Sequence, residues 1–169
     1  MHRGLSLAML MVLAGGCVGQ SADHGGEPDI GAVVTAEGRY RVIRVVDGDT
    51  LVVGYDGETR VRVLGIDTPE IAHPQGRPEC GGRQASKAAH RLLDGTVVEM
   101  AFSSRGDRRD QYDRLLAYIT LPDGTDYGET MLRRGYADVF YAQTHPRETR
   151  YRAAKAAAKK ADRGLWGFC

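Results

Sequence analysis

The chain has 169 residues, of which 42% are apolar and 27% charged. These values suit one globular domain with a real core and leave too little chain for two comfortable ones. The formal net charge of +1 conceals an asymmetry, because residues 1–80 carry seven Lys/Arg against eleven Asp/Glu, whereas residues 81–169 carry sixteen against eleven. A basic second half can attract a polyanion, although a solvated helix explains the same charge.

The N-terminus reads as a targeting segment. Arg3 precedes an apolar run over residues 5–14, which suits a signal-peptide core and is too short to cross a bilayer. Small residues before Cys17 resemble a bacterial lipoprotein cleavage site, where the cysteine is lipidated, although Ala14 replaces the more usual leucine. Ordinary secretory cleavage within residues 16–22 is the alternative.

The chain therefore divides into three expected parts. They are a signal peptide with a lipobox over residues 1–17, a flexible polar linker over 18–37, and a folded domain over 38–169. Export places Cys80 and Cys169 in an oxidising compartment, where two cysteines tend to pair. We expect a disulfide between them; two free thiols are the alternative, and no Cys-x-x-Cys pattern favours a metal site.

The folded part begins with a meander of strands, because β-branched residues recur between Asp-Gly turn signals. Strands are expected over residues 38–46, 50–53, 59–66, 96–102 and 111–121, helices over 85–93, 128–134 and 146–162, and an extended stretch over 136–141. In the last helix, Thr144 is the expected cap and Ala153, Ala156, Ala157 and Ala161 the expected apolar stripe. The order predicts an α+β fold, an OB-fold five-stranded β-barrel with three α-helices, as one of several α+β options.

Carboxylates and an arginine interrupt the first strands. Asp49 opens a strand that needs no carboxylate, and Arg62 lies within an apolar strand that ends at Asp67, with Glu70 close behind. If the first and third strands are neighbours, Asp49 and Asp67 converge, and two carboxylates with a backbone carbonyl and waters suit Ca²⁺. Taken singly, each of these residues also suits a turn or a solvent-facing strand position.

A third segment carries Tyr112 and Arg114 at the start of another apolar strand. A basic side chain beside an aromatic one is typical of phosphate and base contacts. An edge-strand arginine beside ordinary core tyrosines is the simpler interpretation when this segment is considered alone.

Together the three segments resemble the staphylococcal nuclease (thermonuclease) family. The matching motifs are Asp47-Gly48-Asp49-Thr50, Arg62 followed by Asp67-Thr68-Pro69-Glu70, and Asp110-x-Tyr112-x-Arg114 followed by Leu116-Ala117-Tyr118. The resemblance covers residues 38–166, and three motifs in order are far more specific than any one of them. It implies Ca²⁺-dependent hydrolysis of DNA and RNA that leaves 3′-phosphate ends.

The resemblance also implies a role for each matched position. Asp49, Asp67 and the Thr68 carbonyl would bind Ca²⁺, and Glu70 would serve as general base or position the attacking water. Arg62 and Arg114 would hold the scissile phosphate. Tyr112 would contact a terminal phosphate, and Tyr141 would pack on a base. Gln111 and Gln143 stand where lysine and tyrosine are familiar, which suggests altered ligand affinity.

Two other classes of protein are weighed against an enzyme. A non-catalytic nucleic-acid-binding OB module is the first, but such relatives have lost the acidic and arginine residues that this chain keeps. A structural lipoprotein of the cell surface is the second, and it would not need strand-embedded arginines beside carboxylates. We expect an exported monomer, secreted or held in the cell envelope, that contacts a membrane only through its N-terminal lipid.

Overall fold

The computed structural model describes residues 33–34, 38–71, 76–103, 106–140 and 145–169. The strands are β1 (Val33–Val34), β2 (Arg39–Val45), β3 (Thr50–Gly54), β4 (Glu58–Val63), β5 (Ile66–Asp67), β6 (Val97–Ser103), β7 (Leu115–Thr120) and β8 (Asp138–Val139). The helices are α1 (Gly82–Leu93), α2 (Tyr127–Arg133), α3 (Glu148–Lys160) and α4 (Leu165–Phe168). None of the helices in these ranges is long and apolar enough to cross a membrane.

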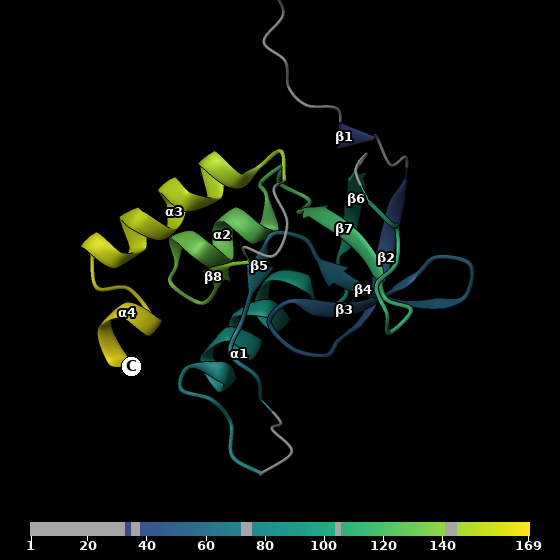
Figure 1. Cartoon of the computed structure of the whole chain (residues 1–169). Helices are drawn as coiled ribbons and strands as arrows, with labels where there is room; N and C mark the ends of the chain where they lie inside the picture. The colour runs from purple at the N-terminus through teal and green to yellow at the C-terminus, as the bar shows by residue number, and fades with distance from the viewer. Residues whose placement is uncertain (1–32, 35–37, 72–75, 104–105, 141–144) are drawn as a thin grey trace, which may run out of the picture.

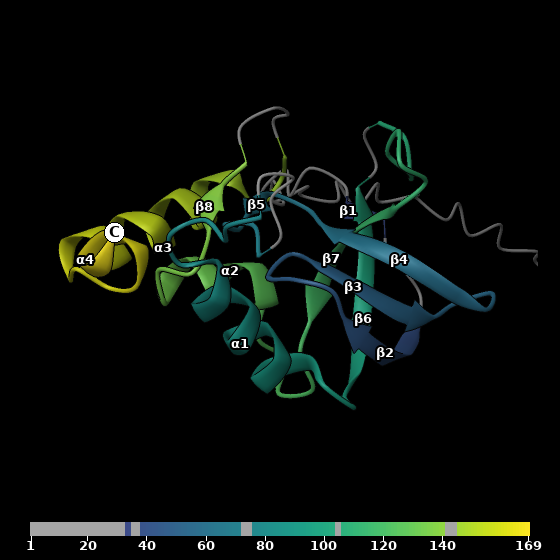
Figure 2. The same cartoon turned by 90° about the horizontal axis from the view of Figure 1, so that it is seen from below.

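Five of the strands close into a barrel. Their order is β6-β2-β3-β4-β7, and β6 also pairs with β7, so the ring has no open edge. The β4–β7 pair is parallel, whereas the other barrel pairs are antiparallel. The helices lie to one side of this barrel in both views (Figures 1 and 2). The predicted α+β fold, an OB-type barrel with three main helices, is confirmed.

Alternation along the strands fills the barrel interior. In β4, the side chains of Val61 and Val63 are fully buried. Arg60 alternates with them and is exposed, and Arg62 is partly buried. Helix α1 covers part of the barrel with the small residues of one face, which are Ala85, Ala88 and Ala89. Small side chains allow the helix to approach closely, so the barrel and the helices share one core.

Helix α2 is tied to the turn between β2 and β3. Asp126 caps the helix by accepting a hydrogen bond from the Glu129 N–H at 3.0 Å. The buried Tyr127 hydroxyl then donates to the Gly48 carbonyl at 2.7 Å. This hydrogen bond from α2 holds the turn that contains Asp49, although Tyr127 and Gly48 are 79 positions apart in the sequence.

The third strand is shorter than predicted. It ends at Val63, and Gly65, with φ +78°, turns the chain so that Ile66 and Asp67 form the separate strand β5. Strand β5 pairs with β8 through Ile66 opposite Val139. Asp67 consequently lies on a two-stranded ladder outside the barrel.

The strand predicted over residues 111–121 begins four residues later, at Leu115. Asp110 explains the difference, because its Oδ1 accepts hydrogen bonds from the N–H groups of Tyr112 and Arg114, both at 3.0 Å. Asp113 takes the left-handed conformation with φ +60° inside this turn. The motif that carries Tyr112 and Arg114 is therefore a turn that leads into β7.

The final helix also differs from its prediction. Helix α3 begins at Glu148, after an Arg147 N-cap without a side-chain capping bond, and Thr144 lies outside the described residues. Its buried stripe is Tyr151, Ala154 and Ala158, so the predicted stripe of Ala153, Ala156, Ala157 and Ala161 is wrong. The buried side chain of Tyr151 determines which face of α3 packs against the core. A prediction based on alanine positions alone did not include it.

Candidate active site

Asp49 is a buried carboxylate at the entrance of β3, with only 4% of its surface exposed. Its Oδ2 accepts hydrogen bonds from the Thr68 backbone N–H at 2.8 Å and from the Thr68 hydroxyl at 3.0 Å. Its Oδ1 accepts from the Thr50 hydroxyl at 3.1 Å. The expectation that the strand needs no carboxylate here is wrong, because Asp49 joins the β2–β3 turn to the Asp67-Thr68 segment.

Arg62 bridges the two carboxylates that the motifs single out. Its Nη1 lies 3.0 Å from Asp49 Oδ2, and its Nη2 lies 2.8 Å from Asp67 Oδ1. The first and third strands, β2 and β4, are not neighbours, because β3 lies between them. Convergence arises instead from the β3–β4 register, which places Thr50 opposite Arg62 and so brings Asp49 beside β4.

Arg114 joins this group from the opposite side of β4. The parallel β4–β7 register places Arg62 opposite Leu116, and Arg114 lies two positions before Leu116 along the chain. Its Nε pairs with Asp110 Oδ2 at 2.7 Å, and its Nη1 lies 3.5 Å from the Thr50 hydroxyl, which in turn contacts Asp49. Arg62 therefore pairs directly with the buried Asp49 carboxylate, and Arg114 is linked to it through the Thr50 hydroxyl.

The electrostatics of the group favour a bound cation. Burial raises the pKa of Asp49 to about 7; the Arg62 guanidinium opposes this rise, and the carboxylates of Asp47 and Asp67 add to it. A divalent cation would offset the same cost of burial and repulsion. The oxygen donors here suit Ca²⁺, but three or more acidic, His or Cys side chains do not cluster anywhere in the described ranges. A cation at this place must therefore draw further ligands from backbone carbonyls and water.

Glu70 is exposed on the loop that follows Pro69. Partial burial raises the pKa of its carboxyl group above the ordinary value, and the nearby carboxylates of Asp47 and Glu79 raise it further. An elevated pKa brings a carboxylate closer to the strength that a general base needs near neutral pH. Asp110 shows the reverse, since its hydrogen bonds with Arg114 and Tyr112 outweigh burial and lower its pKa.

A cleft of about 850 Å³ opens beside the two arginines. Aromatic side chains line it, and two of them face solvent, because Tyr112 is 70% exposed and Phe140 is 45% exposed. The Arg62 guanidinium lies 5.7 Å from the Phe140 ring centroid, and that of Arg114 lies 5.4 Å from the Tyr112 ring centroid. The volume suits a nucleotide-sized ligand.

Phe140 and His145 line this cleft, although the sequence did not mark either as a site residue. Phe140 fell within the predicted extended stretch, and nothing in its spacing separated an exposed aromatic from a core one. His145 also lines the cleft, and its two ring nitrogens, like the Tyr118 hydroxyl, are buried without a hydrogen-bond partner. Burial lowers the pKa of His145. Unpartnered buried polar atoms of this kind are where a water or a ligand would bind.

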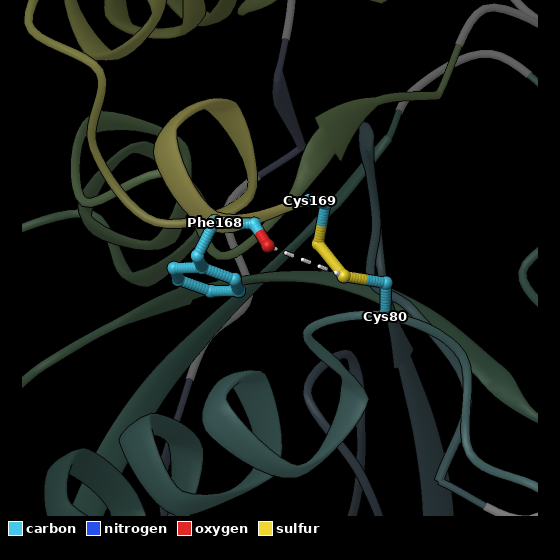
Figure 3. Close-up of a disulfide and its surroundings, with 3 residues drawn as sticks. All are labelled: Cys80, Phe168 and Cys169. Atoms are coloured by element: carbon cyan, nitrogen blue, oxygen red, sulfur yellow. Dashed lines mark hydrogen bonds between the residues drawn. A yellow bond between two sulfur atoms is a disulfide. The ribbon is translucent and has the colours of Figure 1, made fainter.

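The remaining predicted residues lie elsewhere. Cys80 and Cys169 form a disulfide, with Sγ atoms 2.14 Å apart, and both residues are exposed (Figure 3). Tyr141, Gln143 and the predicted lipidation position Cys17 lie outside the described residues. The structure thus brings together Asp49, Arg62, Asp67, Thr68 and Arg114, with Glu70 on the adjoining loop.

Comparisons with known proteins agree with this geometry. The family model described as "Staphylococcal nuclease homologue" matches residues 60–167. The thermonuclease of Staphylococcus hyicus is 33% identical over 132 residues, which cover 77% of this chain and 76% of that protein.

Two longer Bacillus proteins match over a shorter stretch. The SPbeta prophage-derived endonuclease YokF of Bacillus subtilis is 44% identical over 99 residues, or 58% of this chain, and the endonuclease YncB of the same organism is 42% identical over 99 residues. The chain spans 33% of YokF and 46% of YncB. Barrel, motifs and family model together lead to one conclusion: this chain is a member of the staphylococcal nuclease family.

Proposed function

We propose that this protein is a nuclease that hydrolyses phosphodiester bonds in DNA and RNA, depends on Ca²⁺ and leaves 3′-phosphate ends. The observation that carries the proposal is that Arg62 pairs with the Asp49 carboxylate directly, and Arg114 is linked to it through the Thr50 hydroxyl, at the rim of a cleft lined with aromatic residues. Relatives named as thermonuclease and endonuclease support the same activity.

The arginines would supply most of the electrostatic stabilisation. Attack on a phosphodiester builds negative charge on the equatorial oxygens, and a guanidinium stays charged and donates two hydrogen bonds in one plane. Asp67 and Asp110 hold the two guanidinium groups in place before substrate binds. Preorganised cations of this kind contribute strongly to transition-state stabilisation.

Asp49, Asp67 and the Thr68 carbonyl would hold Ca²⁺, with waters completing its ligands. When bound, the ion would supply Lewis-acid stabilisation of the phosphate. Asp49 is suited to this because its buried carboxylate gains most from a counter-charge. Ca²⁺ acidifies water less than Zn²⁺ does, so a separate base is useful, and Glu70 would accept or orient the proton of the attacking water.

The substrate would extend over the exposed rings of Tyr112 and Phe140. Tyr112 stands next to Arg114 and would contact a terminal phosphate, and Tyr141 would pack on a base. Gln111 replaces a positive charge at the cleft wall, which would weaken the hold on an end phosphate. We further propose that the protein is exported as a monomer, secreted or anchored in the cell envelope through a lipid on Cys17.

Digestion of plasmid DNA and of RNA by the folded domain tests the proposal. We expect cleavage with Ca²⁺, none with a calcium chelator, and a rate about a thousandfold lower in Arg62→Ala, as for removal of a key oxyanion donor. Arg60→Ala is the matched control, because Arg60 lies two positions away on the exposed side of β4. Equal cleavage in chelator contradicts the metal role, and binding without any cleavage favours the non-catalytic module.

A further inference from the structure

One glutamate holds the main chain of Glu70 on both sides. The Glu79 N–H donates to the Glu70 carbonyl at 3.0 Å, and the Glu79 carboxylate accepts the Glu70 N–H at 3.0 Å. The Gly82 N–H donates to the Glu79 carbonyl at 3.0 Å, so the start of α1 fixes Glu79 in turn. Glu79 thus satisfies both backbone groups of Glu70 without touching the arginine centre.

Close packing pins the same segment between Glu70 and helix α4. A Cβ atom on Gly82 would lie 2.4 Å from the Glu70 carbonyl oxygen, nearer than real Cβ atoms come. A Cβ atom on Gly81 would lie 2.1 Å from a Leu165 methyl group of α4. At Gly82 the obstacle is main chain, so a side chain there would displace Glu70, and at Gly81 the φ of +86° also favours glycine.

A covalent bond completes the anchorage. Cys80 directly follows Glu79 and is bridged to Cys169, the residue after α4, 89 positions later (Figure 3). Helix α4 is itself fastened to the end of α2, because the Leu165 N–H donates to the Gly135 carbonyl at 2.8 Å. The C-terminal helix is thereby linked through the disulfide to the segment that positions Glu70.

We propose that Glu79 is a positioning residue for Glu70 and that the Cys80–Cys169 bridge anchors Glu79. This inference rests on the proposed role of Glu70 toward the attacking water. A carboxylate on an exposed loop meets that water at a fixed place only if its main chain is held, and a misplacement of ~1 Å can cost a rate factor of about a hundred. Glu79 acts through this restraint and contacts neither the phosphate nor the proposed metal ligands.

Steady-state kinetics of three variants test Glu79. We expect Glu79→Ala to lower kcat about tenfold with KM nearly unchanged, because the arginines that grip the substrate are untouched. Glu79→Gln keeps an oxygen acceptor for the Glu70 N–H and should retain most of the rate. Glu58→Ala, an exposed glutamate at the start of β4, is the control and should behave as the parent protein.

The Glu70→Ala background separates positioning from general structural damage. Measured with enough enzyme to follow residual cleavage, Glu79→Ala should cost less than twofold when Glu70 is already absent. An undiminished tenfold loss in that background, or a normal kcat for Glu79→Ala alone, overturns the inference. A Glu70→Ala variant with the parent rate would instead remove the proposed role of Glu70, so the two failures are distinguishable.

The bridge is tested with Cys80→Ser/Cys169→Ser and with dithiothreitol. The reductant passes two electrons and two protons to the sulfur pair, which gives two thiols and cyclic oxidised dithiothreitol. Below the melting temperature of each sample, we expect the double variant and the reduced parent protein to lose kcat to a similar extent, and the variant not to respond to reductant. A double variant with the parent kcat contradicts the anchoring role.

Discussion

Two buried aspartates, Asp49 and Asp126, each sit beside arginines, yet their surroundings differ in kind. Asp126 pairs with Arg147 at 2.7 Å and with Arg150, accepts the Tyr151 hydroxyl at 2.8 Å, and caps α2. Asp49 has one arginine and lies near other carboxylates. A buried carboxylate with every partner supplied by the protein is structural, whereas one left with surplus negative charge is prepared for an external cation.

The cleft volumes alone would not reveal this difference. A cleft of about 500 Å³ lies beside Asp126 and is lined by Arg133, Arg147 and Arg150. All three arginines pair with Asp126 or with Glu129. Its cationic side chains are therefore committed within the fold. Arg62 and Arg114 also have carboxylate partners, but they border the cleft that Tyr112 and Phe140 line.

Removing Asp126 should have the largest effect on stability. Asp126→Ala leaves Arg147 and Arg150 without their shared partner and removes the cap of α2, so we expect a loss of about 3 kcal/mol in the free energy of unfolding. Urea denaturation measures it, and kcat well below the melting temperature should stay normal. Asp123→Ala, in the exposed turn nearby, is the control and should lose much less stability. If Asp126→Ala and Asp123→Ala lose the same free energy of unfolding, the structural role assigned to Asp126 is wrong.

The ionised carboxylate of Asp49 should lower the free energy of unfolding, and this loss should grow as the pH rises above about 4. Its pKa is raised to about 7 in the folded protein, so the folded state holds a proton that the unfolded chain releases. Without Ca²⁺ the free energy of unfolding should therefore fall as the pH rises from about 4 to about 7 and then level off.

Asp49→Asn should remove this fall and be more stable than the parent protein at pH 8 in chelator, on the order of 2 kcal/mol. Urea denaturation at pH 5 and pH 8 provides the measurement, and Asp56→Asn in the exposed β3–β4 turn is the control. Ca²⁺ should stabilise the parent protein and not the variant. A parent protein whose stability is flat across this range would contradict the account of Asp49.

Tyr112 should show the smallest effect. It is 70% exposed, so Tyr112→Ala should leave the free energy of unfolding within ~0.5 kcal/mol and raise KM up to about tenfold, through a lost contact with a charged phosphate. Tyr112→Phe keeps the ring and removes the hydroxyl, which separates a hydrogen bond from stacking. Unchanged KM values for both variants would exclude Tyr112 from the substrate site.

The sequence predicted the barrel and its motifs because both depend on local patterns. Asp-Gly turns and β-branched runs located the strands, and motif spacing marked Asp49, Arg62 and Arg114. It failed where the decisive contact is remote, because the convergence depends on strand β3 lying between β2 and β4. Glu79 carried no local signal, since it lies nine positions after Glu70 in the sequence.

The parallel pairing of β4 with β7 also determines when the arginine centre can exist. Val61 meets Leu115 only after the intervening helix and two strands have been bypassed, which makes this among the costliest loop closures in the barrel. Arg62 and Arg114 lie on opposite sides of this long connection in the sequence, so only the closed barrel brings the two guanidinium groups to one site. A chain that ends before Leu115 lacks Arg114 or its strand partner, so the arginine centre requires the closed barrel.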